Sequence, residues 1–437
     1  MTNENKSTIC PIPWNHIAIQ QNGEFRICCQ NIYSPFGKLK ENEVFLSINN
    51  STIDEARNSN LIKELRSTML KGERHDLCRL CYSEEDVGLH SKRNHMLSIY
   101  GTENINEYTD SDGSIDTNKW PVRYIDIRFG NLCNLKCRYC GPTDSSLWYE
   151  DYYKLQKSET AKISYYGSKI YEIKKENNKY IVDSLDFEWY EADNFWQQID
   201  KLLPYIDRYY FTGGEPTINK THFELLQQII DKGYAKNVVL EYNSNMFAIP
   251  DKLYDQWKEF KEVGIGCSID GINDMSNYLR PPSKWDVLEK NLDILGNNPT
   301  NTIRGSIATT VSVFNVLHFL DITKWLLQKN YKRIRRAPSY HVLEGPKPMS
   351  IQVLPIATKE FILAEYEEFY KYIGITYGAP MEADYRKMYS GITNYMMAKD
   401  NSSFLPDLKI HTQRLDDIRG DDLSLHVPWL SKILETL

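Results

Sequence analysis

The sequence lacks a long apolar run, an excess of basic charge and an apolar segment near its first residues. No stretch of about eighteen consecutive apolar residues occurs, so we expect no membrane-spanning segment. The net charge of −7 argues against a nucleic-acid partner bound through a basic surface. The opening residues, MTNENKSTIC, are polar and show no signal-peptide pattern, so we expect a cytoplasmic protein.

The composition is that of a folded globular protein. Hydrophobic residues make up 41% of the chain and charged residues 25%, which excludes a disordered chain. A length of 437 residues is too great for one ordinary core, so two or three domains are expected.

Cysteine is absent from residue 141 to residue 266, and eight of the nine cysteines fall into three groups on the N-terminal side of this gap. The groups are Cys10, Cys28 and Cys29; Cys78 and Cys81; and Cys133, Cys137 and Cys140. In a cytosolic chain such clusters indicate metal ligands or reactive thiols before disulfides. Cys267 stands alone in the apolar run GIGCSID, and we expect it to be a small buried side chain.

Strand and helix patterns alternate from about residue 120 to residue 355. The expected strands are 122–130, 208–214, 237–245, 263–270, 303–313 and 331–338, with helical patterns between most of them. This alternation predicts an α/β fold with a parallel sheet and helices outside it, closing into a partial six-stranded (βα)6 barrel. Ligands then lie at the carboxyl ends of the strands.

The first hundred residues have a different, α+β character. Residues 16–29 predict a hairpin with its turn at Asn22-Gly23, and residues 52–72 predict a helix that ends at Gly72. We therefore expect one domain over residues 1–100.

Three further segments complete the predicted organisation. The polar residues 101–119 read as a linker, and residues 141–206 form an insertion in the barrel. The insertion contains a hairpin with its turn near Asn177-Asn178, which is either a substrate-contacting lid or a surface decoration. Residues 356–437 predict a mostly helical extension that becomes irregular after Lys399.

The loop after the first barrel strand carries three cysteines in the sequence CNLKCRYC, residues 133–140. Three thiolates on one loop hold three irons of a [4Fe–4S] cube and leave the fourth iron open. An open position marks a reactive metal site, whereas a closed set is structural or carries electrons. A zinc knuckle on the same cysteines is the alternative interpretation.

The motif C-x3-C-x2-C, with an aromatic residue before its last cysteine, resembles that of the radical S-adenosylmethionine (radical SAM) superfamily. The sequence GGEP at 213–216 resembles a second motif of that family, at the end of the second strand. The resemblance implies that SAM chelates the open iron of the Cys133, Cys137 and Cys140 cluster. An electron from the cluster then cleaves SAM, and the 5′-deoxyadenosyl radical takes hydrogen from a substrate.

The same resemblance supplies candidate SAM contacts at successive strand ends. They are Gly213, Gly214, Glu215, Pro216, Asn243, Ser244, Ser268, Asp270 and Arg280. Glu215 is expected to accept hydrogen bonds from the SAM ammonium, and Asp270 to lie near the substrate. Arg280 is expected to pair with a carboxylate of SAM or substrate, with a surface salt bridge as the alternative.

The N-terminal cysteines resemble the auxiliary-cluster module called twitch, a short relative of the SPASM domain. Twelve residues separate Cys10 from Gly23 and four separate Gly23 from Cys28, while CRLC adds Cys78 and Cys81. Four thiolates saturate a second [4Fe–4S] cluster, although a structural zinc site remains an alternative. Adjacent Cys28 and Cys29 face opposite sides of a strand, so only one of them ligates, and Cys28 is chosen for its distance from Gly23.

The position of this module departs from the family pattern, because it precedes the barrel. The resemblance implies an enzyme whose auxiliary cluster transfers electrons or stabilises the fold. Its substrate is a peptide or a small metabolite, with the peptide favoured, and its electron donor a protein such as flavodoxin or ferredoxin. The competing classes are an iron–sulfur electron carrier without catalysis and a zinc-stabilised interaction protein.

Overall fold

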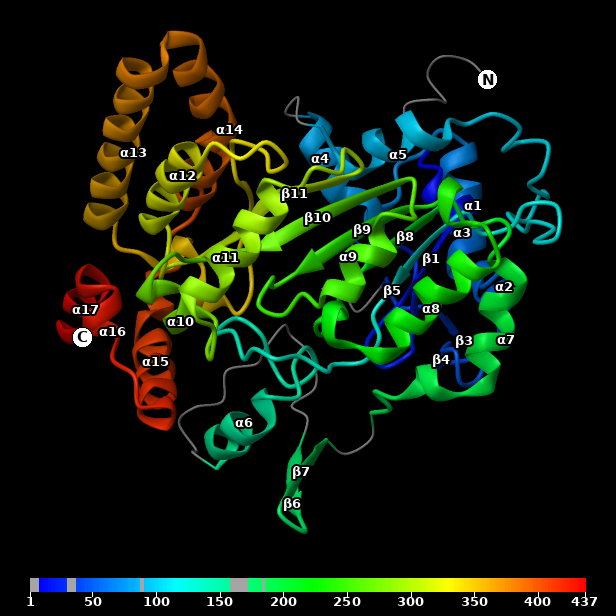
Figure 1. Ribbon diagram of the computed structural model, residues 1–437, viewed down its shortest axis with the longest axis horizontal. Coiled ribbons are helices and arrows are strands. Elements are labelled where there is room, and N and C mark those ends of the chain that lie inside the picture. Colours follow the sequence, from blue (N-terminus) through cyan, green and yellow to red (C-terminus); the bar gives the residue numbers. More distant parts are fainter. Residues whose placement is uncertain (1–7, 30–36, 87–89, 158–171, 183–184) are drawn as a thin grey trace. The chain divides into compact units, whose positions relative to one another are not determined.

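The computed structural model describes residues 8–29, 37–86, 90–157, 172–182 and 185–437 (Figure 1). Parts of the expected insertion, 158–171 and 183–184, therefore lie outside the described residues, as do residues 1–7 of the polar N-terminal sequence. None of the described helices has the length and apolar character needed to cross a membrane.

The chain divides into two compact units. The first consists of residues 1–132, 185–242 and 251–263, and the second of residues 133–184, 243–250 and 264–437.

Eight strands are ordered β12-β11-β10-β9-β8-β5-β1-β2 in one sheet. Their bounds are β1 His16–Ile19, β2 Phe25–Arg26, β5 Tyr124–Ile127, β8 Arg208–Phe211, β9 Val239–Ser244, β10 Glu262–Ser268, β11 Ile303–Val311 and β12 Ser339–Val342. Five of the six strands predicted for the barrel, β5, β8, β9, β10 and β11, follow one another in chain order with β12 after them, and the described strands leave the sheet open. The predicted α/β class with a partial barrel is confirmed.

In the first unit, the predicted N-terminal hairpin is confirmed and joins the sheet. β1 pairs with β2 in antiparallel fashion, and the turn contains Gly23 at φ 76°. On its other edge β1 pairs with β5 in parallel, with His16 opposite Tyr124 and Ile19 opposite Ile127. All four residues of β1 are buried, as expected for an interior strand with both faces covered.

The first unit carries its helices around this part of the sheet. They are α1 Ile12–Asn15, α2 Ile53–Arg57, α3 Asn60–Leu70, α4 Arg79–Asp86, α5 Lys92–Tyr100, α7 Asp193–Leu202, α8 Lys220–Asp231 and α9 Asp251–Trp257, with a short ribbon of β3 Lys40–Glu41 and β4 Val44–Phe45. The single helix predicted over 52–72 is two helices. Thr52 and Glu55 form a capping box that starts α2. The helical conformation ends at Asn58, and α3 begins at Asn60.

The segment 101–119 is irregular, as predicted, but it is packed against α3. Arg66 donates to the carbonyl oxygen of Gly113 at 3.1 Å, and the Asn58 amide donates to that of Ile115 at 2.9 Å. Ile105 and Ile115 are buried. The segment therefore belongs to the packed part of the first unit.

The second unit combines the last strands with helices. These helices are α6 Trp148–Gln156, α10 Asp274–Leu279, α11 Trp285–Gly296, α12 His318–Lys329, α13 Ile356–Tyr377, α14 Ala379–Met397, α15 Leu405–Arg419, α16 Leu423–His426 and α17 Pro428–Glu435. α13 and α14 run as a helical hairpin, and α15 packs against α6 (Figure 1). A large apolar core joins Val311 of β11, Phe319 of α12 and Tyr389 of α14.

Two predictions about this unit are wrong. The last strand is β12 at Ser339–Val342 and not 331–338, where the only described ladder contact is a single bridge between Gly305 and Ile334. The tail also stays helical beyond Lys399. Its short helices are separated by caps, such as Gly420 in the left-handed region at φ 67°, which interrupt the apolar periodicity.

The hairpin predicted within the insertion is confirmed. β6 Ile173–Glu176 pairs with β7 Lys179–Val182, and Glu176 lies opposite Lys179. Asn177 and Asn178 have φ values of 47° and 63°, as a two-residue hairpin turn with two left-handed residues requires.

The packing of 101–119 on α3 predicts that Gly113→Ala destabilises the protein more than Gly233→Ala. Both glycines have positive φ, +86° and +78°, so each substitution costs about 1–2 kcal/mol of backbone strain. At Gly113 the new Cβ would also lie 2.1 Å from the Lys63 carbonyl oxygen, whereas nothing lies within 4 Å at Gly233. Thermal unfolding of the two variants measures the difference. Equal melting temperatures would contradict this packing.

Candidate iron–sulfur sites

The three-cysteine loop follows β5 and is held by its backbone in the second unit. The amide of Lys136 donates to the carbonyl oxygen of Pro281 at 2.7 Å, and the amide of Arg138 donates to that of Leu279 at 2.8 Å. These bonds run on both sides of Cys137, so its position is fixed by main-chain contacts.

Side chains of the loop add further anchors. Tyr139 is 3% exposed and belongs to the apolar core of the second unit. The Trp148 indole donates to the carbonyl oxygen of Cys137 at 2.9 Å, and the amide of Cys140 donates to the same oxygen at 3.1 Å. The turn between Cys137 and Cys140 is therefore closed, with both thiols on one short segment.

Two N–H donors approach the sulfur atoms from neighbouring segments. The Asn245 amide nitrogen lies 3.9 Å from the Cys133 sulfur, and an Arg280 guanidinium nitrogen lies 3.6 Å from the Cys137 sulfur. A hydrogen bond with Cys140 and the charge of Arg280 lower the pKa of Cys137, against the effect of burial. Donors of this kind stabilise thiolate over thiol, which is the form that binds iron.

Arg280 has a partner that neither sequence interpretation anticipated. Its guanidinium donates to Asp270 at 2.6 Å, and the Asp270 side chain is fully buried. The second carboxylate oxygen of Asp270 accepts the amide of Thr310 at 2.7 Å. Burial acts to lower the pKa of Arg280, but the Asp270 carboxylate raises it. Asp270 thus orients the arginine that contacts the Cys137 sulfur.

The GGEP segment lies in the first unit, against residues that lead into the cysteine loop. A Cβ at Gly213 would lie 2.8 Å from the Cβ of Arg128, and one at Gly214 would lie 2.2 Å from the Leu132 carbonyl oxygen. That oxygen accepts the amide of Glu215 at 2.7 Å. The glycines therefore permit the close approach of two backbones.

Glu215 is buried and begins a short helical turn. One carboxylate oxygen accepts both the amide and the hydroxyl of Thr217, at 3.1 and 2.7 Å. Pro216 opens the turn, which spans Pro216–Ile218. The carboxylate is thus oriented by its own helical turn.

The other predicted SAM contacts differ in exposure. Asn243 is exposed, Ser268 is half-buried, and Ser244 is buried with its hydroxyl accepting the amide of Met246 at 3.1 Å. The neighbour Asn245, which the sequence reasoning passed over, contacts Cys133. Its position directly after β9, at the carboxyl end of a strand, was the available signal.

Four of the N-terminal cysteines surround one pocket in the first unit. Cys10, Cys28, Cys78 and Cys81 line a small pocket together with apolar residues and the cations Lys92 and Arg93. Burial, and then the charge of Cys78, raises the pKa of Cys10, while burial and Cys28 raise that of Cys78. The thiols are thus near neighbours. Among the described residues, no three Cys, His, Asp or Glu side chains converge as ligands of a single metal ion.

The remaining two cysteines do not line this pocket, although Cys29 is close enough to Cys81 for their charges to interact. Burial raises the pKa of Cys29, whose charged neighbours include Lys92, Asp126 and Arg128, and this thiol is not among those lining the pocket. Strand β2 ends at Arg26, so the argument from strand alternation for choosing Cys28 does not apply. Cys28 nevertheless lines the pocket and Cys29 does not. Cys267 is fully buried on β10, as predicted.

Comparison with protein families agrees with this division into two cysteine sites. Residues 127–314 match the family model of the radical SAM superfamily. Residues 10–82 match the SPASM model, an iron–sulfur cluster-binding domain. The chain thus has a segment that matches radical SAM domains and, before it, a segment that matches SPASM domains. A radical SAM domain implies a [4Fe–4S] cluster and SAM, and a SPASM domain implies auxiliary iron–sulfur binding, so the predicted cofactors are confirmed at this level.

Solved structures that are similar to this chain include the following two. One is anSMEcpe with bound AdoMet and Cp18Cys peptide, 15% identical, with a TM-score of 0.36 over 64% of this chain and 67% of that chain. Another is Streptococcus suis SuiB bound to S-adenosylmethionine, 11% identical, with a TM-score of 0.34 over 76% of this chain and 67% of that chain. No curated protein matches the sequence.

The buried ion pair in the radical SAM domain predicts that Asp270→Asn lowers stability strongly. Loss of the carboxylate charge leaves Arg280 without its partner, and breaking such a pair costs about 3–5 kcal/mol. The control is Asp255→Asn, which breaks an exposed pair with Lys258 at 2.8 Å and should change stability by less than about 1 kcal/mol. Thermal unfolding and bound iron are measured for both. Equal melting temperatures would show that the pair is not buried in solution.

Proposed function

We propose that the protein is a radical SAM enzyme in which Cys133, Cys137 and Cys140 hold a [4Fe–4S] cluster with one open iron. When bound, such a cluster would supply the electron for reductive cleavage of SAM, and the substrate would then lose a hydrogen atom. The observation that carries the proposal is the single closed loop presenting three thiols, with N–H groups of Asn245 and Arg280 beside two of the sulfurs.

The other residues predicted to contact SAM have supporting roles in this proposal. The turn that carries Glu215 is shaped by Gly213, Gly214 and Pro216. The Glu215 carboxylate would accept hydrogen bonds from the SAM ammonium. Asn243, Ser244 and Ser268 remain candidates for ribose contacts. The observed contacts favour Asp270 and Arg280 as groups that orient Cys137, in place of a direct carboxylate contact by Arg280.

The auxiliary cluster is assigned to Cys10, Cys28, Cys78 and Cys81. Four thiols around one pocket fit a closed ligand set, which leaves no iron for SAM. Lys92 and Arg93 also line the pocket, and cations there offset the negative charge of four thiolates. Such a cluster transfers electrons to or from the substrate radical, or stabilises the unit.

The proposed substrate is a peptide, with a small metabolite as the second candidate. The acidic balance of the chain, its thirty tyrosines and the hairpin β6–β7 within the insertion favour the larger substrate. A protein donor such as flavodoxin or ferredoxin would supply the electron.

The assignment predicts that anaerobic reconstitution gives about eight irons per chain and SAM cleavage to 5′-deoxyadenosine. Cys137→Ala should abolish cleavage, because the cluster loses a ligand. Cys78→Ala should lower bound iron while retaining some cleavage. Iron analysis and chromatography of the products measure both effects.

The outcomes separate the competing classes of protein. An iron-loaded chain that leaves SAM intact would be an electron carrier, and a colourless zinc-loaded chain would be an interaction protein. Equal cleavage by Cys137→Ala and the unsubstituted chain would refute the enzyme assignment.

The pocket geometry predicts a difference between two adjacent cysteines. Cys28→Ser should lower bound iron by about four per chain, because it removes a ligand of the auxiliary cluster. The matched variant Cys29→Ser should keep the full iron content, since this side chain does not line the pocket. Iron loss in Cys29→Ser with full iron in Cys28→Ser would reverse the assignment.

A further inference from the structure

Helix α15 of the C-terminal extension contacts the cysteine loop, although it lies outside both segments matched by family models. It presents Asp416 and Arg419 one helical turn apart, on the same side of the helix. Asp416 is 7% exposed, and the Arg419 side chain is 3% exposed. Buried charges on a helix surface require partners, and both partners come from or beside the cysteine loop.

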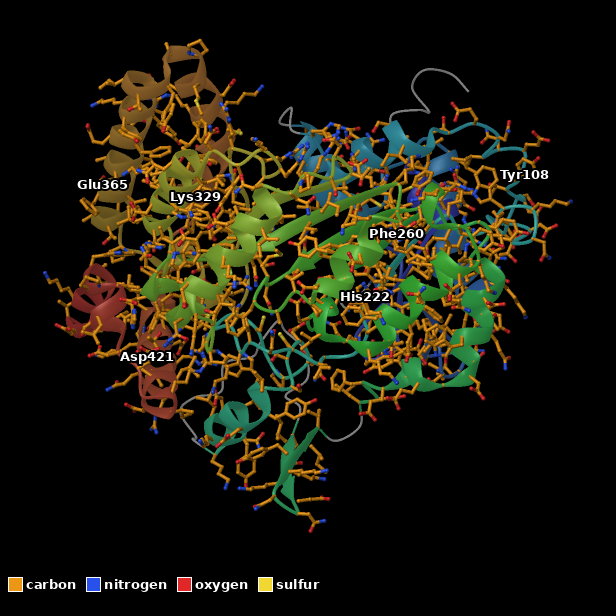
Figure 2. All side chains as sticks on the ribbon, in the orientation of Figure 1. Tyr108, His222, Phe260, Lys329, Glu365 and Asp421 are labelled. Carbon is orange, nitrogen blue, oxygen red and sulfur yellow. The ribbon has the colours of Figure 1, made fainter. Side chains whose placement is uncertain are left out.

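Asp416 pairs with Arg138, which stands between Cys137 and Cys140. The Arg138 side chain is fully buried, donates to the Tyr278 carbonyl oxygen at 2.8 Å, and forms an ion pair with Asp416. Its guanidinium also lies 3.6 Å from the centre of the Tyr278 ring. A second carboxylate, that of Asp421, lies 3.8 Å from the Arg138 guanidinium; Asp421 is labelled in Figure 2.

Arg419 contacts two residues of α6, the helix that follows the loop. It donates to Asp151 at 2.8 Å, and the second oxygen of Asp151 accepts the Lys136 ammonium at 2.9 Å. The guanidinium of Arg419 lies over the Trp148 ring, 4.6 Å from its centre. Trp148 in turn donates to the Cys137 carbonyl oxygen. The residues on each side of Cys137 are therefore both tied to α15, Lys136 through Asp151 and Arg138 directly.

The charges of this contact are carried by the loop itself, by α6 and by α15. His411 of α15 is held neutral, because burial and then the two arginines lower its pKa to about 3. The ion pairs of this contact are those of Lys136 and Arg419 with Asp151, and of Arg138 with Asp416 and Asp421; the pair of Arg280 with Asp270 adds two further charges beside Cys137.

We infer that α15 is a built-in clamp, in which Asp416 and Arg419 position the three-cysteine loop and set the charge around its cluster. This inference rests on the proposed function, because it assumes that the loop carries a cluster. Neither residue touches the reacting atoms; both act through Arg138, Trp148 and Asp151. The helical extension is then part of the working site and not a separate appendage.

The clamp predicts opposite electrostatic effects for two substitutions on one helix. Arg419→Gln removes a positive charge, so reduction of the cluster becomes harder and its potential falls. Asp416→Asn removes a negative charge, so the potential rises. A merely structural loosening of the loop would move both variants in the same direction.

The experiment is a reductive titration of the full-length, anaerobically reconstituted protein, followed by electron paramagnetic resonance. The signal that changes when SAM is added identifies the relevant cluster. The control is Arg386→Gln, which breaks the pair with Glu367 between α13 and α14, away from the loop. We expect a lower potential for Arg419→Gln, a higher one for Asp416→Asn and an unchanged one for Arg386→Gln. SAM cleavage should fall several-fold in the first two variants.

Shifts of the same sign, or no shift in either variant while the unsubstituted chain cleaves SAM, would refute the clamp alone. Absence of SAM cleavage in the unsubstituted chain would instead refute the proposed function. If the charge-removing variants fail to fold, Arg419→Lys and Asp416→Glu decide the question. Both should keep the potential and lower the cleavage rate, whereas unchanged cleavage in both would contradict the clamp.

Discussion

The three-cysteine site depends on hydrogen bonds between the backbone of the cysteine loop and the backbone at the end of α10. Two amides, those of Lys136 and Arg138, donate to carbonyl oxygens of Pro281 and Leu279. Main-chain hydrogen bonds leave the loop side chains available for other contacts: Tyr139 enters the core, and the thiols of Cys137 and Cys140 stay on one turn. Arg280 lies between these two acceptor residues, and the same pairing brings its side chain beside the Cys137 sulfur.

The two cysteine sites differ in how the chain presents its thiols, and this difference fits two kinds of cluster. In the proposed function, the site of Cys133, Cys137 and Cys140 takes three thiols from one short loop, and a small molecule would supply the fourth ligand. The auxiliary site gathers four thiols from the segment before α1, from the residues after β2 and from the region where α4 begins. Bringing three separated segments together makes the auxiliary site dependent on folding of the whole first unit. A single-loop site instead depends on the residues that hold the loop.

Much of the fold and both cysteine sets could be predicted from sequence, because they depend on local patterns. The apolar strands, the Asn177-Asn178 turn and the spacing of Cys133, Cys137 and Cys140 are such patterns. The parallel pairing of β1 with β5 could not be predicted, because no local feature specifies a partner over a hundred residues away. The contacts of Asp416 and Arg419 with the loop were missed for the same reason: each residue alone is an ordinary charge on a helix.

The central claim is that one cluster keeps an open iron that SAM completes. Electron–nuclear double resonance of the reduced full-length protein, with SAM labelled by nitrogen-15 at its amino group, tests this directly. The account predicts a hyperfine coupling between the label and one of the two clusters. This coupling should disappear when the three-cysteine site is removed. A reduced, iron-loaded protein that binds labelled SAM without any such coupling would contradict it.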